Sequence, residues 1–221
     1  MNHFIDLIEF ILHIDKELVK LVAEYGSLVY GILFTIIFLE TGLVITPFLP
    51  GDSLLFAAGA IAAQGSLKVE YIYVLLVFAA IIGDNVNYWI GRLIGEKIKF
   101  SDNARILKKK YITRTHAFYE KYGTTAIIIA RFVPIVRTLT PFVAGLGRMT
   151  YKKFLPFDVI GGILWVSIFV FGGYLFGNLT LVKDHFSLVV IAIIFLSLLP
   201  AVIEYLKHKR NRSKSMVSPL D

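Results

Sequence analysis

The chain has 221 residues, of which 57% are hydrophobic and 18% are charged, and its mean hydropathy is +0.72. A soluble domain is about 45–50% apolar and about 25% charged, so this composition argues against a soluble fold and indicates membrane-spanning segments. The net charge is +7, but the basic residues flank apolar runs as juxtamembrane charges do, which argues against nucleic-acid binding. The absence of cysteine excludes disulfides and thiolate metal sites.

The N-terminal segment, residues 1–27, carries apolar residues at helical spacing and charged residues on the opposite face. Such an amphipathic helix can lie flat in the membrane interface or pack against the spans, and the pattern does not distinguish these arrangements. We expect a membrane domain over residues 28–206 to follow, and then a basic tail over 207–221.

Two short apolar pieces, residues 28–39 and 53–63, open the expected membrane domain. Neither is long enough to cross about 30 Å of hydrocarbon, which requires about 20 residues. The residues between them that should break a helix are Pro47, Pro50 and Gly51. Two half-length helices joined by such a break predict a re-entrant hairpin over 28–64, buried in protein or lining a cavity.

The first full-length predicted span covers residues 71–91, and a basic segment over 92–121 follows it. The polar residues that interrupt this span are Asp84, Asn85 and Asn87. A polar patch on a span can bridge neighbouring helices, so these residues could support a site or serve only packing.

The pattern of the first hairpin repeats over residues 123–147, where a short apolar piece is interrupted and then resumes. The residues expected to interrupt it are Arg131, Pro134, Arg137 and Pro141. We therefore predict a second re-entrant hairpin here. Full spans are expected after it, over 154–178 and 186–206.

Three basic segments, residues 92–121, 148–153 and 207–221, should be cytoplasmic by the positive-inside rule, whereas 65–70 should face the other side. Both ends of the second hairpin then lie on the same side, which supports its re-entrant path. The expected fold is an all-α integral membrane protein with two oppositely oriented re-entrant hairpins and about three full transmembrane helices, as in inverted-repeat transporters. Matching small-residue motifs support a repeat: Ala58-Gly59 with Ala144-Gly145, and Gly91-xxx-Gly95 with Gly173-xxx-Gly177.

Four charged residues fall in the predicted hairpin breaks, namely Glu40, Asp52, Arg131 and Arg137. A charge at membrane depth costs roughly 2.5–3.5 kcal/mol on insertion scales, so such residues are usually paired, hydrated or bound to something. Two guanidiniums can hold a phosphate through bidentate hydrogen bonds, so the arginines are candidate phosphate-binding residues. Two partly desolvated carboxylates can exchange protons, so the acids are candidate proton-coupling residues. Alternatively, two buried ion pairs lock the hairpins together, and these pairs could also open when an anion arrives.

Other features carry weaker signals. Asp158 lies near the start of its predicted span, where an acid interacts favourably with the helix dipole, so we expect a capping role. Trp165 is expected in the core or at the membrane interface. The run Gly51-Asp52-Ser53-Leu54 matches the signature of a soluble esterase family, but the five histidines lie in flanking or loop segments and lack metal-ligand spacing. We therefore expect neither an enzyme nor a metal or cofactor site.

The stretch from Glu40 to Asp52 (ETGLVITPFLPGD), followed by Arg131 to Arg137 (RFVPIVR) and Ala144-Gly145, resembles the DedA family of bacterial inner-membrane proteins in the SNARE-associated, or VTT, superfamily. The resemblance covers about residues 5–210 and implies opposed re-entrant hairpins and a relation to eukaryotic lipid scramblases. It also implies lipid translocation: members are associated with undecaprenyl phosphate, with phosphatidylethanolamine and with the proton motive force. The family's acidic pair corresponds to Glu40 and Asp52, and its arginine pair to Arg131 and Arg137.

The favoured function is therefore a proton-dependent translocase of a phosphate-bearing lipid, such as undecaprenyl phosphate or a phospholipid, in the inner membrane with a cytoplasmic C-terminus. The expected partners are membrane lipids and protons, and self-association stays open. One alternative is a proton-coupled antiporter of small ions or drugs, although paired arginines argue against a cationic substrate. The other is a non-transporting scaffold in which the charges are internal locks.

Overall fold

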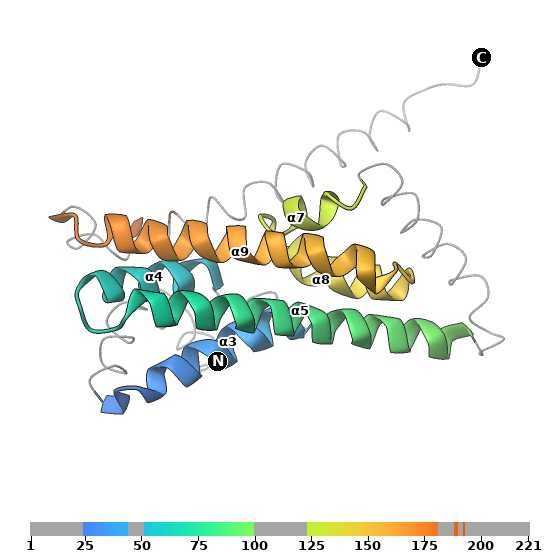
Figure 1. Ribbon diagram of the computed structural model, residues 1–221, viewed down its shortest axis with the longest axis horizontal. Coiled ribbons are helices and arrows are strands. Elements are labelled where there is room, and N and C mark those ends of the chain that lie inside the picture. The colour runs from blue at the N-terminus through green and yellow to red at the C-terminus, as the bar shows by residue number, and fades with distance from the viewer. Residues whose placement is uncertain (1–23, 44–50, 100–122, 181–187, 190–191, 193–221) are drawn as a thin grey trace, which may run out of the picture.

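The computed structural model describes residues 24–43, 51–99, 123–180, 188–189 and 192 (Figure 1). The helices defined there are α3 (Leu28–Gly42), α4 (Gly51–Ala63), α5 (Val69–Lys99), α7 (Ala126–Ala130), α8 (Pro134–Leu146) and α9 (Tyr151–Phe176). This part of the chain contains no strand, so its fold is all-α. The expected features that lie outside the described residues are most of the helix at 1–27, Pro47, Pro50, the part of the basic segment 92–121 after Lys99, the C-terminal tail and nearly all of the span at 186–206.

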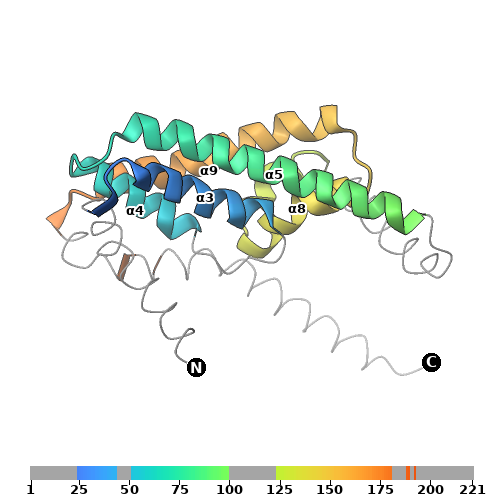
Figure 2. The ribbon, with the colours of Figure 1, turned by 90° about the horizontal axis from the view of Figure 1, so that it is seen from below.

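Two helices are long and apolar enough to cross a membrane, α5 over Val69–Gly95 and α9 over Tyr151–Phe176. They run side by side in opposite directions (Figures 1 and 2). These helices cover most of the segments expected as spans, 71–91 and 154–178. Helix α5 continues to Lys99, so the first residues of the expected basic segment are helical. Helices α3 and α4 have 15 and 13 residues, or about 20 Å each, which is short of the membrane thickness.

The ends of the short helices lie near the predicted breaks but differ from the expected positions by a few residues. Helix α3 continues through Gly42, so Glu40 lies in its last turn, and Asp52 lies in the first turn of α4. Helix α8 begins at Pro134, and the preceding Val133 is extended (φ −120°, ψ 106°), because a residue before proline avoids the helical region. The break expected at Pro134 coincides with the start of α8.

The prediction that Arg137 and Pro141 break the second hairpin was wrong, because both lie inside α8. An internal proline removes one backbone hydrogen bond and costs about 3 kcal/mol in an isolated helix. Here α8 packs along α5, and this contact maintains the helix across Pro141.

The repeated small-residue motifs form two close helix contacts. Helix α4 packs on the C-terminal half of α9, where a Cβ at Gly59 would overlap the Val170 carbonyl and one at Gly173 would overlap the Phe56 carbonyl. Helix α8 packs on α5 in the same way, with Gly145 against Tyr88 and Gly91 against Phe142. Small residues permit such backbone approach in membrane helices. Helices α4 and α8 thus each pack on the long helix of the other half of the chain.

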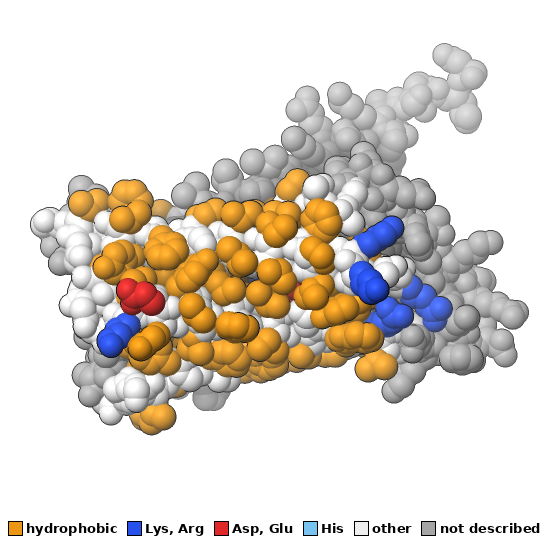
Figure 3. Space-filling model, in the orientation of Figure 1, with side chains coloured by type: hydrophobic (Ala, Val, Ile, Leu, Met, Phe, Trp, Pro, Cys, Tyr) orange, Lys and Arg blue, Asp and Glu red, His pale blue; other side chains and the backbone are white. Residues whose placement is uncertain are grey.

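The outer surface is apolar over the middle of the molecule. Large hydrophobic side chains project outward along both long helices, among them Phe78, Trp89, Ile168 and Leu175. Figure 3 shows hydrophobic side chains across this face, with Lys and Arg gathered at the end where α9 begins. An apolar band with charges at its ends matches a bilayer environment.

Candidate functional site: two buried arginine clusters

The first buried charged cluster, here the Arg137 cluster, joins α3, α4, α8 and α9. Arg137 on α8 donates from Nη1 to Asp52 Oδ1 at 2.5 Å and from Nη2 to Glu40 Oε1. Trp165 on α9 donates its indole N–H to Asp52 Oδ1 at 2.8 Å, and its ring lies under the guanidinium with 4.4 Å between Cζ and the ring centroid. One arginine therefore holds two carboxylates with two different nitrogens, and an indole assists.

The start of α4 adds to the compensation of charge in the Arg137 cluster. Asp52 lies in the first turn of α4, and the Glu40 carboxylate occupies the space that a Cβ at Gly51 would need. The N-terminus of a helix carries unpaired N–H groups and a partial positive charge, which favours nearby anions. The absence of a side chain at Gly51 thus lets the end of α3 approach the start of α4.

The second buried charged cluster, here the Arg131 cluster, joins α5, α9 and the residue that follows α7. Arg131 Nη2 donates to Asp158 Oδ1 at 2.6 Å and also forms the ion pair with Asp84 Oδ2. The stem of Arg131 runs against Gly161, where a Cβ would lie 2.9 Å from Arg131 Cδ. Both carboxylates therefore meet the same nitrogen of one guanidinium.

Several polar atoms of the two clusters have no hydrogen-bond partner among the described residues. In the Arg131 cluster these are Arg131 Nη1, Asp84 Oδ1 and Asp158 Oδ2, and in the Arg137 cluster they are Glu40 Oε2 and Arg137 Nε. Buried polar atoms are normally paired, so the open carboxylate oxygens can take up a proton or accept from water, and the open guanidinium nitrogens can donate to water or an anionic group. Within the described residues, no group of His, Asp and Glu is arranged to hold a metal ion.

Asn87 on α5 connects the elements around the Arg137 cluster. Its side-chain amide donates to the Thr41 carbonyl of α3 at 3.0 Å and to the Thr138 carbonyl of α8 at 2.8 Å. Asp84 lies one helical turn earlier on the same buried face of α5 and is within electrostatic range of both Arg131 and Arg137. Helix α5 therefore contributes Asp84 to the Arg131 cluster, and its Asn87 bridges the two helices that carry Glu40 and Arg137.

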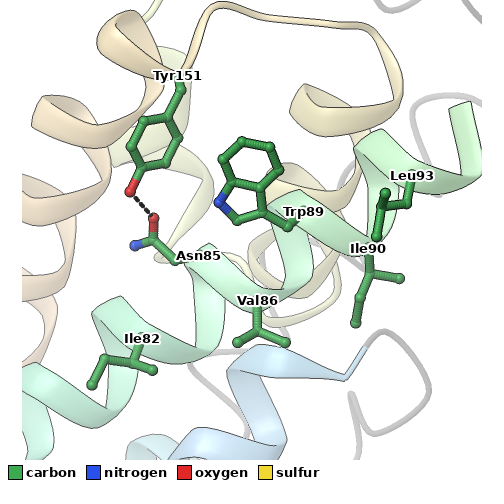
Figure 4. A pocket seen from close by; sticks show the side chains of 7 residues that line it. All are labelled: Ile82, Asn85, Val86, Trp89, Ile90, Leu93 and Tyr151. Carbon is green, nitrogen blue, oxygen red and sulfur yellow. Dashed lines mark hydrogen bonds between the residues drawn. The ribbon is translucent and has the colours of Figure 1, made fainter. Parts of the chain in front are cut away.

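Asn85 does not join either cluster, although the sequence grouped it with Asp84 and Asn87. Its side chain accepts a hydrogen bond from the Tyr151 hydroxyl at 2.6 Å and donates to the Ile81 carbonyl at 2.7 Å. It lies at the edge of a groove of about 370 Å³ on the outer surface (Figure 4). The other residues lining this groove are Ile82, Val86, Trp89, Ile90, Leu93 and Tyr151. A helix turns successive residues by about 100°, which separates Asn85 from its polar neighbours.

The four charged residues expected from the sequence all lie buried in these clusters, but their pairing differs from the one expected. Glu40 and Asp52 meet only Arg137, whereas Arg131 pairs with Asp84 and Asp158. The expected capping role of Asp158 was wrong, because Asp158 lies beyond the first turn of α9 and is buried against Arg131. The contribution of Trp165 was missed altogether. The sequence did contain a signal for the buried pairing of Asp158, which lies three and four residues before Gly161 and Gly162. Small residues at this spacing leave room for a buried partner side chain, here that of Arg131.

Comparison with known proteins identifies the class. Residues 49–175 match the VTT domain. The chain is 55% identical to Protein DedA of Escherichia coli (strain K12) over 211 residues, which are 95% of this chain and 96% of that protein. It is 42% identical over 84% of its length to an uncharacterized membrane protein of Mycobacterium leprae (strain TN), of which 83% is covered. It is 38% identical over 69% of its length to inner membrane protein YqjA of Escherichia coli (strain K12), of which 69% is covered.

The chain is therefore a VTT-domain membrane protein, and it belongs to the DedA family. No solved structure matches it. The VTT match begins just before α4 and ends within α9, so it includes Asp52, Arg137 and all three residues of the Arg131 cluster, while Glu40 precedes it.

Proposed function

We propose that this protein is a lipid translocase that moves a phosphate-bearing lipid, such as undecaprenyl phosphate or a phospholipid, across the bacterial inner membrane. The observation that carries the proposal is the pair of buried guanidiniums between apolar helices, each already holding anionic groups. A guanidinium that binds carboxylate oxygens can bind phosphate oxygens in the same geometry. The surrounding apolar surface suits a lipid whose tail stays in the bilayer while its headgroup crosses.

The proposed transport path uses an inverted repeat of two re-entrant hairpins, α3 with α4 and α7 with α8. The support for it is that α4 packs on α9 and α8 packs on α5 through equivalent glycine contacts, while α5 and α9 run in opposite directions. Transporters with this design place their substrate sites where broken helices meet. We propose that the ends bearing Lys152 and Lys153, and the C-terminal tail, face the cytoplasm.

In the proposed mechanism, protons compete with the arginines for the carboxylates. In the arrangement described here the carboxylates occupy both guanidiniums, so a phosphate must displace them. Protonation of Glu40 and Asp52 would weaken their hold on Arg137 and leave it able to bind the headgroup. A proton gradient would then favour the state that binds lipid on one side, because a ligand shifts an equilibrium only through its differential affinity for two states.

The test is transport of labelled lipids in liposomes, with and without an imposed pH gradient. Arg137→Lys keeps the charge but not the two-pronged geometry, so we expect at least a tenfold loss of transport. Glu40→Gln and Asp52→Asn should retain lipid binding but lose dependence on the gradient. Glu70→Gln is the matched control, because Glu70 is an exposed acid in the first turn of α5. Wild-type rates in all three cluster variants would refute the proposal.

Two other functions predict different results in this assay. A proton-coupled antiporter would move small ions across the same liposomes and leave labelled lipids in place. A non-transporting scaffold is consistent with complete ion pairs, and in that case exchanging the charges of the Arg137 cluster (Glu40→Arg with Arg137→Glu) should preserve function in cells. We further propose a non-enzymatic protein whose ligands are lipids and protons, without nucleic acid or bound cofactor. Self-association would be tested by crosslinking in the membrane.

A further inference from the structure

The Arg131 cluster contains more negative than positive charge. Two carboxylates, from Asp84 and Asp158, face one guanidinium, and all three side chains are buried. With both acids ionised, the group would carry a net charge of −1 between apolar helices. An uncompensated charge in such surroundings is costly, and buried groups usually avoid it by taking up or losing a proton.

The Arg137 cluster has the same count of charged groups but more donors. Its two acids receive two different nitrogens of Arg137, the indole of Trp165 and the N-terminal end of α4. In the Arg131 cluster both acids meet Nη2 alone, and the other terminal nitrogen, Nη1, has no partner among the described residues. Asp84 lies in the middle of α5, and Asp158 lies beyond the first turn of α9, so neither acid lies at the N-terminus of a described helix.

Because Asp84 Oδ2 and Asp158 Oδ1 both contact Arg131 Nη2, the two carboxyl groups of the Arg131 cluster lie close to each other. Two ionised carboxylates are both acceptors and repel at this distance, whereas a single shared proton turns the contact into a hydrogen bond. The described charged or titratable groups near them on other elements are Arg137 on α8, which attracts Asp84, and Tyr151 at the start of α9, which lies near Asp158. Glu40 and Asp52 are held by Arg137.

We propose that Asp84, Arg131 and Asp158 form a proton-binding site that holds one proton between the two carboxyl groups in the resting protein. The proton makes the cluster electrically neutral, with one ionised carboxylate left to pair with Arg131. Uptake of one further proton would leave Arg131 without an ionised partner, whereas the Arg137 cluster releases its arginine only when both of its acids lose their charge. The inference concerns the resting protein and stands whether or not a lipid is the substrate.

The experiment is infrared spectroscopy of the purified full chain in lipid nanodiscs at neutral pH, in H₂O and D₂O. A protonated carboxyl group gives a C=O stretching band that is separate from the bands of carboxylates and amides and that shifts in D₂O. We expect this band in the wild type and its loss in Asp84→Asn and in Asp158→Asn. Glu40→Gln is the matched control, because Glu40 is a buried acid paired with the other arginine, and the band should persist in it.

Thermal stability supplies the second measurement. Each single asparagine variant should fold with a melting temperature close to that of the wild type, because asparagine replaces a neutral acid. The double variant Asp84→Asn/Asp158→Asn should melt much earlier, because it leaves Arg131 buried without an anionic partner. If only one of the two single variants folds, the loss or persistence of the C=O band in that variant decides for or against the proposal.

Several results would overturn the proposal. These are absence of the band in the wild type, its loss in Glu40→Gln, its persistence in a single variant that folds, and failure of both single variants to fold. A melting temperature that rises with sodium in the wild type but not in the variants would show that a cation neutralises the site. None of these outcomes depends on a transport assay, so this inference and the proposed translocase can fail separately.

Discussion

The two clusters have the same composition, one guanidinium and two carboxylates, but they differ in how the charge is balanced. Arg137 donates from a different nitrogen to each acid, and the Trp165 indole and the N-terminal end of α4 further stabilise the carboxylates. Arg131 presents one nitrogen to two acids that lie within reach of each other. Charge count alone therefore does not describe a buried ionic site, because the number and placement of donors decide whether it stays fully ionised.

This difference suggests different tasks for the two arginines. The Arg137 cluster joins α3, α4, α8 and α9, and so it connects short helices of both halves of the chain. The Arg131 cluster joins the long helices α5 and α9 to the break between α7 and α8. We expect the Arg137 cluster to hold the halves of the molecule together until both of its acids are protonated, and the Arg131 cluster to release its arginine more easily.

Removing each arginine should give the largest effect and a clear ranking. Arg137→Gln leaves Glu40 and Asp52 buried without a counter-charge, which we expect to cost about 3–5 kcal/mol of unfolding free energy. Arg131→Gln should cost less, about 2–3 kcal/mol, because a second proton can neutralise an already half-protonated pair. Equilibrium unfolding in mixed detergent micelles measures both values. The comparison fails if the Arg131 variant is the less stable one.

Lysine substitutions test the donor geometry directly. Arg137→Lys cannot present two separate nitrogens to two acids, so we expect a loss of about 2 kcal/mol. Arg131→Lys should cost about 1 kcal/mol or less, because a single ammonium can meet two acids that already share one nitrogen. The same unfolding assay applies. Equal losses would show that the two guanidiniums are used in the same way.

The sequence predicted the parts of this arrangement that follow from local pattern. Helical periodicity and length gave the spans now seen as α5 and α9, and the Pro134 break followed from the backbone restriction before proline. The cost of a charge in hydrocarbon identified Glu40, Asp52, Arg131 and Arg137. Pairing depends on which helices lie side by side, and no local signal assigns Arg131 to acids that lie 47 residues before it and 27 residues after it in the chain.

Asp158 and Asn85 show why the sequence alone did not place every polar residue correctly. Asp158 looked like an acid near a helix start, and only the packing of α7 against α9 gives it an arginine partner. Asn85 looked equivalent to its polar neighbours, and its separation from them follows from the face of α5 that contacts the other helices. Both outcomes depend on tertiary contacts, which override local preferences.

Trp165→Phe should separate the indole hydrogen bond from the ring contact in the Arg137 cluster. Phenylalanine keeps an aromatic face under Arg137 but removes the N–H that Asp52 accepts at 2.8 Å. We expect a loss of about 1.5 kcal/mol, the value of a hydrogen bond to a charged group. Combining it with Arg131→Lys should give additive losses, because the charged partners of Trp165 and of Arg131 are different residues. Strong non-additivity in a double-mutant cycle would show that the clusters act as one unit.

Asn85→Ala should have the smallest effect, which would show that the face of α5 bearing Asn85 lies outside both clusters. Asn85 follows Asp84 directly, yet it faces the outer groove, where it accepts from the Tyr151 hydroxyl and donates within its own helix turn. Removing these two hydrogen bonds at a partly exposed position costs about 0.5–1 kcal/mol in total, and the freed Tyr151 hydroxyl can turn toward the membrane interface. Asn87→Ala is the matched comparison, because it deletes two buried bonds that join α3 to α8 and should cost about twice as much. Lipid transport should stay at the wild-type rate in Asn85→Ala and fall in Asn87→Ala. A transport defect in Asn85→Ala equal to that in Asn87→Ala would mean that the outer groove, rather than the buried face of α5 alone, takes part in function.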